Sequence, residues 1–332
     1  MGAIVDDRTE TLDDLDRKIV VALQVNVRAS WKQIAQAVGC SETTAARRAG
    51  RLRELGLLHF LVVQETLSPA VMSMYLEVRC EPGRARSVGE ELSAHPSIRF
   101  VALTTGEFEI LAEHQSDSKE SLTRFLTEEL TAIPGIREVV THTGTRIYKK
   151  SNEWARDILG PAAEALGDPV AEPRTPLTSL SDVDQRLIDL LKEDPRRSTA
   201  DLAQSLGVTD SVTRRRLEAL RAGKAVSFST YIKPGLMGFG VESFAWLDVD
   251  FPSMLGVADR LMRLPQVRYL ATIAGTESLL CELILADLGA FLEFQSTVLA
   301  GFEGLRGARF SVELQSLKRS YIRVDRLGAP AS

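Results

Sequence analysis

Residues 30–53, SWKQIAQAVGCSETTAARRAGRLR, decide the fold at the start of the chain. Ser30 followed three residues later by Gln33 predicts a capping box, in which the serine oxygen accepts a backbone N–H in the first turn of a helix. Gly39 predicts the end of that helix, because glycine adopts a left-handed backbone without a steric penalty. Ser41 predicts the N-cap of a second helix. Together these signals predict a helix-turn-helix.

The same pattern occurs twice in the chain. A shift of 168 residues places Ser30 and Gly39 on Ser198 and Gly207, and the similarity continues downstream at a shift of 169. A period this long predicts a duplicated two-domain unit rather than a solenoid of short repeats. Between the copies, residues 160–179 contain four prolines, which disfavour a helix and predict an extended linker.

The second helix of each helix-turn-helix carries arginines opposite its apolar stripe. Arginines on a helix of small residues fit the major groove of DNA, where they can meet phosphates or guanine edges. Arg48 and Arg216 lie at the side of the helix, so phosphate contact and pairing with Asp16 or Asp184 both remain open; the arginines could also simply be solvated. The candidate DNA-contacting residues are Thr43, Arg47, Arg48, Arg51, Ser211, Arg214, Arg215 and Arg216.

Composition and charge are compatible with this interpretation. The 332 residues are 44 % hydrophobic and 26 % charged, which excludes a disordered or fibrous main state. The net charge is −5, yet residues 28–53 hold six basic residues against one acid, and residues 196–224 hold seven against three. Two basic islands in an acidic chain indicate two separate anion-binding faces.

Targeting and metal-binding signals are missing from the sequence. No apolar run approaches the roughly 18 residues of a membrane helix, and the N-terminus does not resemble a signal peptide. The three cysteines lie far apart, and the four histidines show no ligand spacing. We therefore expect a reducing, cytoplasmic compartment, no membrane association, no metal site and no disulfide framework.

After each helix-turn-helix the hydrophobic pattern indicates alternating strands and helices. The predicted strands are 74–80, 98–104, 108–114 and 136–141 in the first copy, and 244–250, 267–273, 279–285 and 308–314 in the second. A helix follows the first and the third strand of each set. The order βαββαβ is the ferredoxin-like split unit.

The predicted fold class is therefore α+β, with two copies of a winged-type helix-turn-helix domain followed by a ferredoxin-like βαββαβ domain. The expected domains are a first helix-turn-helix at 10–60, a first ferredoxin-like domain at 70–150, a linker at 160–179, a second helix-turn-helix at 180–228 and a second ferredoxin-like domain at 240–322.

The order of these motifs is similar to that of a known family. Residues 12–19 (LDDLDRKI), 34–41 (IAQAVGCS) and 47–56 (RRAGRLRELG) resemble the DNA-binding domain of the Lrp/AsnC, or feast/famine, transcriptional regulators. The second copy repeats the pattern, so the resemblance covers nearly all of both halves. It implies a sequence-specific regulator that binds double-stranded DNA, responds to a small metabolite, and has no catalytic residues and no cofactor.

The resemblance also implies an effector site. In the family small effectors, often amino acids, bind near the turn between the second and third strands of the βαββαβ domain. Here that turn contributes Thr105, Gly106, Glu107 and Glu109, with Thr141 on a neighbouring strand. Backbone N–H groups beside the glycine can hold a carboxylate, and an acid can hold an ammonium. The family favours Asp at the two glutamate positions, and the alternative is a tight hairpin without a ligand.

The assembly implied by the resemblance is a pseudo-dimer. The two ferredoxin-like domains of one chain are expected to pair face to face, as two subunits do in the family, through strand residues such as Phe108, Ile110, Leu279 and Leu283. Two chains are then expected to form a homodimer with four DNA-binding domains.

An enzymatic alternative also follows from resemblance. Fused two-copy proteins similar to this family include sirohaem-type decarboxylases, which bind a tetrapyrrole and use histidines. His59, His114 and His142 all lie in the first half and could converge. The basic recognition helices are intact in both halves, however, and an enzyme would not need them. We therefore expect a regulator rather than an enzyme.

Overall fold

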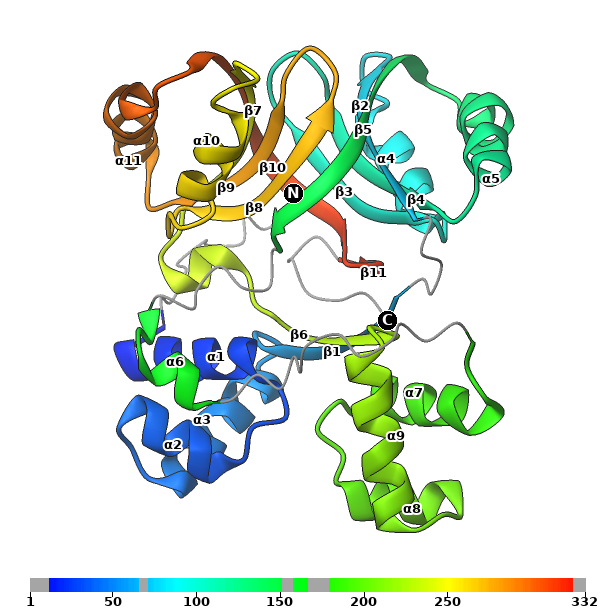
Figure 1. The fold of residues 1–332 in the computed structure, drawn as a ribbon, viewed down its shortest axis with the longest axis vertical. Coiled ribbons are helices and arrows are strands. Elements are labelled where there is room, and N and C mark those ends of the chain that lie inside the picture. Colours follow the sequence, from blue (N-terminus) through cyan, green and yellow to red (C-terminus); the bar gives the residue numbers. More distant parts are fainter. Residues whose placement is uncertain (1–11, 66–70, 151–157, 167–178, 325–332) are drawn as a thin grey trace, which may run out of the picture.

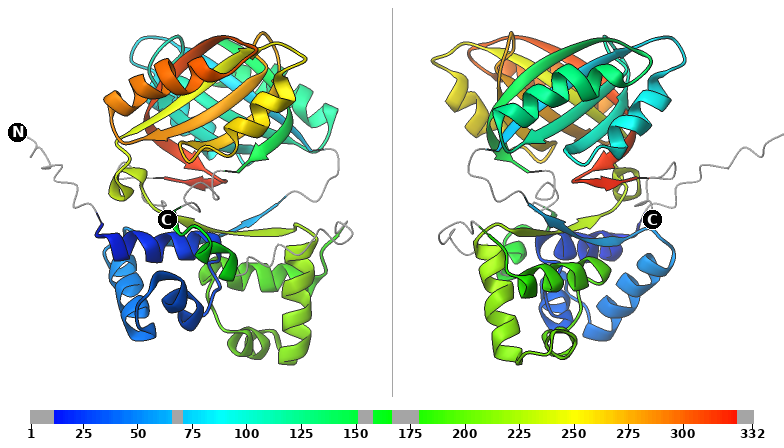
Figure 2. Two further views of the ribbon diagram at one scale, coloured as in Figure 1. Left: turned by 60° about the vertical axis from the view of Figure 1, so that its left-hand side comes forward. Right: turned by 90° about the vertical axis from the view of Figure 1, so that its right-hand side faces the viewer.

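The computed structural model describes residues 12–65, 71–150, 158–166 and 179–324, which form two layers (Figure 1). One layer contains both helix-turn-helix domains. The other is a closed barrel of strands with helices on its outside, and the same two layers are visible from the side in Figure 2. The predicted α+β class, with helix-turn-helix and ferredoxin-like units in two copies, is confirmed.

Each helix-turn-helix domain contains three helices. They are α1 (Asp14–Val25), α2 (Trp31–Val38) and α3 (Glu42–Glu54) in the first copy, and α7 (Asp182–Glu193), α8 (Thr199–Leu206) and α9 (Asp210–Ala222) in the second. The predicted capping box between Ser30 and Gln33 is present. Gly39 and Gly207 end α2 and α8 with φ angles of 75° and 69°. These signals act within a few residues, so local sequence determines the helices.

A two-stranded ribbon joins the two helix-turn-helix domains. It consists of β1 (His59–Gln64) and β6 (Val226–Tyr231), which pair antiparallel along their whole length. α1 contacts β6 and α7 contacts β1, so each domain packs on the strand of the other copy. The hydroxyl of Thr230 on β6 donates to the carbonyl of Leu23 on α1 at 2.8 Å.

The two ferredoxin-like units are called module 1 (residues 72–149) and module 2 (residues 241–319). Module 1 consists of β2 (Met72–Cys80), α4 (Ala85–Ala94), β3 (Ile98–Thr104), β4 (Ile110–Ser116), α5 (Lys119–Arg124) and β5 (Ile136–Lys149). Module 2 consists of β7 (Val241–Val249), α10 (Met254–Leu261), β8 (Val267–Ala274), β9 (Leu279–Leu285), α11 (Leu288–Glu293) and β10 (Leu305–Arg319), followed by a short β11 (Ile322–Arg323). α5 and α11 each continue into a π turn and a 3-10 turn, over residues 125–132 and 294–301.

The two modules form one barrel. Their strand orders, β3-β4-β2-β5 and β8-β9-β7-β10, are both the ferredoxin-like arrangement. β5 also pairs with β8, and β10 also pairs with β3, so the sheet closes on itself. The expected pseudo-dimer is therefore present within a single chain.

The last strand of each module is much longer than predicted. The sequence predicts strands over 136–141 and 308–314, whereas β5 has 14 residues and β10 has 15. The first part of each strand pairs within its own module, and the last part pairs with the other module. The extension is a tertiary effect, because the neighbouring module supplies the backbone partners.

The barrel has apolar cores on both sides of its sheet. Ile110 lies in the core beneath the helices of module 1, and Leu279 and Leu283 lie in the core beneath those of module 2. Only Phe108 of the four expected interface residues faces the barrel interior, where its ring meets Trp246 with centroids 5.2 Å apart. The expectation for the other three is wrong, because alternate residues of a strand point to opposite faces.

The first helix-turn-helix domain has additional packing from elsewhere in the chain. α6 (Ala162–Ala165) buries Ala163 and Leu166 against it, and the Pro234–Met237 turn adds Leu236 and Met237. The predicted extended linker is therefore helical over α6, while residues 167–178 lie outside the described residues. Within the described ranges, no helix is long and apolar enough to cross a membrane.

Candidate nucleic-acid interface

α3 and α9 each present a buried stripe and an exposed face. The buried residues are Ala45, Ala49 and Leu52 in α3, and Thr213, Leu217 and Leu220 in α9. The exposed residues on the other side are Thr43 and Arg47 in α3, and Ser211, Arg214 and Arg215 in α9. Ser41 and Thr209 cap the two helices, so each begins at the same point after the turn. Both helices are thus positioned to offer one face to a ligand.

Two of the candidate arginines in the first copy are bound to Asp16, which is buried on α1. Arg48 donates to Asp16 Oδ1 at 3.0 Å, and Arg51 donates to Asp16 Oδ2 at 2.7 Å. Arg48 also donates to Asp13, and this bond holds the pKa of the Asp13 carboxyl below its usual range. These bonds tie α3 to α1, although the side chain of Arg51 remains 53 % exposed.

The second copy repeats part of this arrangement. Arg216 donates to Asp184 Oδ1 at 2.9 Å and to Ser181 Oγ at 3.0 Å. Arg214 donates to Asp210 within α9, also at 2.9 Å, in a largely exposed pair of little energetic value. For Arg48 and Arg216, the sequence left phosphate contact and carboxylate pairing open, and the structure shows the pairing.

Arg47 and Arg215 differ from the other arginines. They occupy equivalent exposed positions, and neither makes an ion pair or hydrogen bond to any residue that the structure describes. Thr43 and Ser211 lie one turn earlier, at i−4, and therefore on the same face. A guanidinium without an internal partner can form a bidentate bond to a phosphate or a base edge without breaking an existing bond.

Two other arginines of the basic islands connect the two helix-turn-helix domains. Arg28 donates to the carbonyls of Pro195 and Arg197 at 2.6 and 2.9 Å. Arg196 donates in return to the carbonyls of Val27 and of Ala29, the latter at 2.9 Å. We call this pair, Arg28 and Arg196, the arginine latch.

The arginine latch follows the internal symmetry of the chain, because its members are 168 residues apart. The guanidinium of Arg196 lies 4.2 Å from the ring centroid of Trp31, and that of Arg28 lies 5.9 Å from that of Phe228. Burial, together with the proximity of Arg28, lowers the pKa of Arg196 to about 10. Both arginines belong to the basic islands that were predicted to bind anions. The duplication of the chain, which places them at equivalent positions, is the sequence signal that links them.

The predicted effector turn lies at the junction of the modules. Gly106 has a φ of 105°, and the backbone N–H of Thr105 donates to the carbonyl of Val312 on β10 at 2.9 Å. Glu107 is exposed. Glu109 is already bound, because its carboxylate accepts the backbone N–H of Cys80 at 2.8 Å.

Thr141 does not join the effector turn. It lies on β5 in register with Leu76 on β2, whereas the turn adjoins β10 of module 2. The structure therefore brings Thr105, Gly106, Glu107 and Glu109 together and leaves Thr141 apart. The corresponding turn of module 2 adjoins β5, where a Cβ on Gly275 would lie 2.8 Å from the ring of His142.

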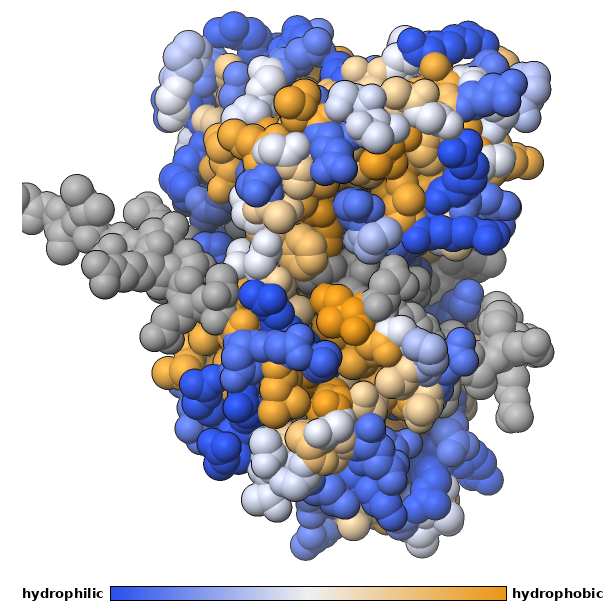
Figure 3. Space-filling view, turned by 90° about the vertical axis from the view of Figure 1, so that its left-hand side faces the viewer, coloured by the Kyte–Doolittle hydropathy of each residue, from blue (hydrophilic) through white to orange (hydrophobic). Residues whose placement is uncertain are grey.

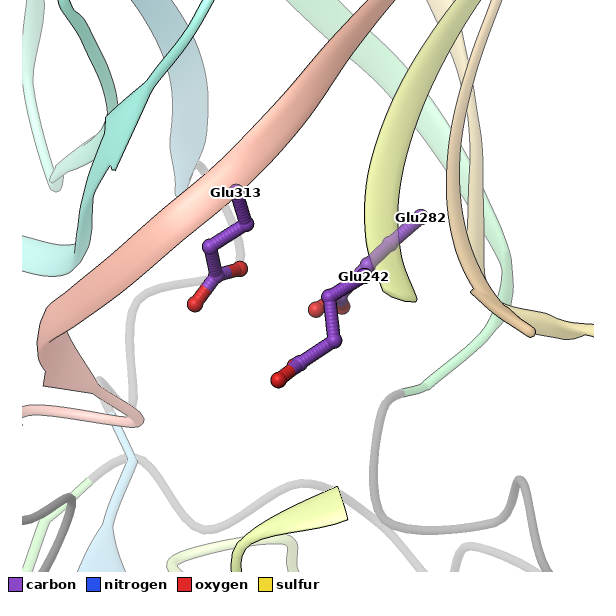
Figure 4. A group of neighbouring side chains, drawn as sticks. All are labelled: Glu242, Glu282 and Glu313. Carbon is purple, nitrogen blue, oxygen red and sulfur yellow. The ribbon is translucent and has the colours of Figure 1, made fainter. Parts of the chain in front are cut away.

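The barrel interior contains a cluster of buried charges near the end that carries β11. Figure 4 shows Glu242, Glu282 and Glu313 pointing toward one another from three strands, with carboxylate oxygens within 4.8 Å. This spacing would suit a cation, but Arg319 already donates to all three, at 3.1, 2.7 and 2.7 Å. Burial raises the pKa of Glu313 to about 7, despite the nearby Arg319. All three carboxylates therefore accept a hydrogen bond from Arg319 without an added ion.

A cavity of about 40 Å³ adjoins this cluster and is lined by aromatic and charged side chains. The hydroxyls of Tyr75 and Tyr269 share a hydrogen bond of 2.5 Å, and Arg99 donates to Glu113 at 2.9 Å. The volume suits one or a few water molecules, and these polar groups are bonded to one another. The cavity therefore belongs to a polar core.

The histidines named in the enzymatic alternative lie in three separate places. His59 is on β1 in the helix-turn-helix layer. His142 meets Glu77 at 3.0 Å inside the barrel. His114 stacks on Phe125 beneath α5, with centroids 3.9 Å apart, and burial lowers its pKa to about 4. The three side chains do not converge, so they form no common site of the kind that the enzymatic alternative requires.

Comparison with known families agrees with this geometry. A model of the AsnC-type helix-turn-helix domain matches residues 12–53 and 180–221. A model of a C-terminal dimeric alpha+beta barrel domain matches residues 84–157. The matched segments contain α1 to α3, α7 to α9 and most of module 1.

Relatives align with about half of the chain. The HTH-type transcriptional regulator FL11 of Pyrococcus horikoshii is 28 % identical over 145 residues, which are 43 % of this chain and 95 % of that protein. An uncharacterized HTH-type transcriptional regulator of Pyrococcus furiosus is 29 % identical over 146 residues, 44 % of this chain and 99 % of that protein. The solved structure of the siroheme decarboxylase NirDL aligns over 92 % of this chain and 93 % of the NirDL chain, with a TM-score of 0.58. At 12 % identity, that likeness concerns the fold alone.

Proposed function

Because the chain is a member of the Lrp/AsnC family that carries two AsnC-type helix-turn-helix domains, we propose that it regulates transcription by binding double-stranded DNA sequence-specifically through both domains. The observation that carries this proposal is a pair of exposed arginines, Arg47 and Arg215, which occupy equivalent positions of α3 and α9 and have no partner among the described residues. Residues at these positions can enter the major groove when a recognition helix docks.

The two domains are proposed to read different half-sites. Next to Arg47, α3 carries Gly50, where an added Cβ would meet nothing within 4 Å. The corresponding residue of α9 is Glu218, which is exposed and would repel phosphates. A glycine inside a helix costs about 1 kcal/mol relative to alanine, so α3 gains close backbone approach at the expense of helix stability. Unequal outer faces favour an asymmetric site.

Selection of bound duplexes from a random pool tests this proposal directly. The expected site has two dissimilar halves. Arg47→Ala should then weaken binding about 5- to 150-fold if the arginine reads a base, and should relax specificity in one half only. Arg215→Ala should do the same in the other half. Arg186→Ala is the matched control, because Arg186 donates to the Ser205 carbonyl within its own domain. A symmetric site within the footprint of one chain, or equal loss in both halves, contradicts the proposal.

Salt dependence separates base contacts from phosphate contacts. Loss of a phosphate contact should lower the slope of log K against log salt by about 1, without changing sequence preference. Arg51 is expected to behave in this way, since it is half exposed yet bonded to Asp16. Arg48 should affect the stability of the domain more than its DNA affinity.

We further propose that a small metabolite, such as an amino acid, acts at the turn formed by Thr105, Gly106, Glu107 and Glu109. Support comes from the position of this turn at the junction of the modules, where a ligand can contact both. A ligand there can shift DNA binding only by its differential affinity for two arrangements. Glu107→Gln should abolish the thermal shift caused by such a ligand, whereas Glu128→Gln, at an exposed glutamate on the outer face of module 1, should not. If no metabolite stabilises the wild type, the turn is a structural hairpin.

The enzymatic alternative receives no support from the histidines, because they lie apart. Its remaining support is the likeness in fold to a siroheme decarboxylase. The absorption spectrum of the purified protein distinguishes the two functions: a Soret band would favour a tetrapyrrole-binding protein.

A further inference from the structure

The outer helices of module 2 expose large apolar side chains. On α11, Leu288 is 68 % exposed and Leu292 is 64 % exposed, and the two are one helical turn apart. On the neighbouring α10 side, Phe251 is 85 % exposed and Leu255 is 58 % exposed. Single exposed apolar residues are ordinary, but four large ones on the outer helices of one module require an explanation.

An apolar groove lies further along the same helical run. It has a volume of about 230 Å³ and lies between the continuation of α11 and β10. Its apolar lining includes Leu299, Ala300, Phe302, Leu305, Ala308 and Phe310. Exposed leucines therefore stand at the start of this run, and a groove that can receive apolar side chains lies at its end. Figure 3, which faces this side of the molecule, shows apolar residues gathered over the barrel layer.

Module 1 provides an internal comparison, because it has the same fold at a shift of 169 residues. There, Lys119 and Thr123 occupy the positions of Leu288 and Leu292, and Pro82 and Arg86 occupy those of Phe251 and Leu255. The exposed face of α5 and its π turn carries four charged residues, Lys119, Glu120, Arg124 and Glu128. The equivalent positions in module 2 carry one, Glu293. The fold does not require leucine at these positions, so the apolar face is particular to module 2.

The barrel leaves an outer face as the route for further association. The edge strands of the two modules are already paired with each other, because β5 pairs with β8 and β10 pairs with β3. Each chain has this apolar face on one module and a charged face on the other. A self-complementary face favours a closed two-fold contact, in which residue i meets residue j and j meets i.

We propose that the face formed by Leu288, Leu292 and the adjoining groove is the dimer interface between two copies of this chain. The proposed two-fold axis is perpendicular to α11, which makes the two α11 runs antiparallel, so the start of one lies beside the end of the other. The leucine pair of each copy thereby enters the groove of its partner. A specific interface buries at least about 1,000 Å² in total, which sets the area that the two faces must cover.

Sedimentation equilibrium of the full chain at micromolar concentrations tests the proposal. The wild type should approach twice the chain mass of 36.5 kDa. The variant Leu288→Lys with Leu292→Thr takes the residues of module 1, which the same fold accommodates, and should raise the dissociation constant at least tenfold. The matched control is Lys119→Ala with Thr123→Ala on module 1, which should leave the mass unchanged. Circular dichroism melting checks that each variant folds.

A second measurement tests the antiparallel arrangement. Leu292→Cys and Ala300→Cys in one chain lie eight residues apart on a helical run, too far for an intrachain disulfide. Oxidation should therefore give a covalent dimer. A wild type that stays monomeric at these concentrations overturns the proposal, even if another protein co-purifies with it. A double leucine variant that dimerises as the wild type does also overturns it, because the interface must then lie elsewhere.

Discussion

Removal of the arginine latch should change the spacing of DNA half-sites that the protein accepts. The perturbation is Arg28→Ala with Arg196→Ala. Each guanidinium donates two hydrogen bonds to carbonyls of the other domain. Such charge-assisted bonds contribute about 1.5–3 kcal/mol each. Burial of the two guanidinium groups, visible in the lowered pKa of Arg196, offsets much of this gain.

The net contribution is therefore about 1–2 kcal/mol for each arginine, or about 2–4 kcal/mol for both. The domains should remain joined after the substitution, because the β1–β6 ribbon is intact and neither arginine belongs to it. Their relative orientation should loosen, however. In the wild type, a site whose two halves are differently spaced can be bound only if the latch opens. If opening the latch costs about 2 kcal/mol, the affinity for that site falls about thirtyfold.

Fluorescence anisotropy with two duplexes measures this effect. One duplex carries the selected site, and the other carries two extra base pairs between the halves, which rotates one half by about 70°. The affinity for the selected site, divided by the affinity for the duplex with extra base pairs, should be large for the wild type and for Arg186→Ala. The same ratio should be about thirtyfold smaller for the latch variant. Equal ratios for wild type and latch variant would refute the idea that the latch fixes the spacing.

Two buried groups should give stability a pH dependence of opposite sign. Burial lowers the pKa of His114 to about 4, so the unfolded chain binds more protons than the folded chain between pH 6.5 and 4. The free energy of unfolding should therefore fall as the pH drops through this range. In His114→Phe, the urea concentration at the unfolding midpoint should depend less on pH over the same range. Burial raises the pKa of Glu313 to about 7, so the folded chain binds more protons than the unfolded chain, and the free energy of unfolding should fall as the pH rises toward 7. Glu313→Gln should remove this decline. If the pH dependence of stability is the same in this variant as in the wild type, Arg319 keeps the carboxylate ionised.

The parts of the fold that follow from local signals could be predicted from the sequence. Ser30, Gly39 and Ser41 each act through bonds within one turn, and the structure contains the caps and the helices that they predict. The strands at 98–104 and 279–285 also match, because they are continuous apolar or alternating segments bounded by turns. The duplication predicted the pseudo-dimer, because a domain that pairs with a second copy of itself has that copy in the same chain.

The parts that depend on the other copy could not be predicted in this way. β5 and β10 extend because strands of the opposite module supply their hydrogen-bond partners. A basic residue in a sequence also does not reveal its partner. Arg28 and Arg48 contribute equally to a count of positive charge, yet one donates to carbonyls of the other domain and the other to Asp16. Arg47 and Arg215 lie exposed on the predicted helical face without a partner among the described residues, and their contacts with DNA stay a prediction.

The joining of both modules in one polypeptide has a consequence for a scarce protein. Two separate subunits that formed this barrel would come apart on dilution below their dissociation constant. Here each module meets its counterpart at an effective concentration set by the connecting chain, of millimolar order for short flexible connections and independent of the number of molecules in the cell. The barrel and its pair of DNA-binding domains should therefore persist at a few copies per cell, and only association through α11 would respond to abundance.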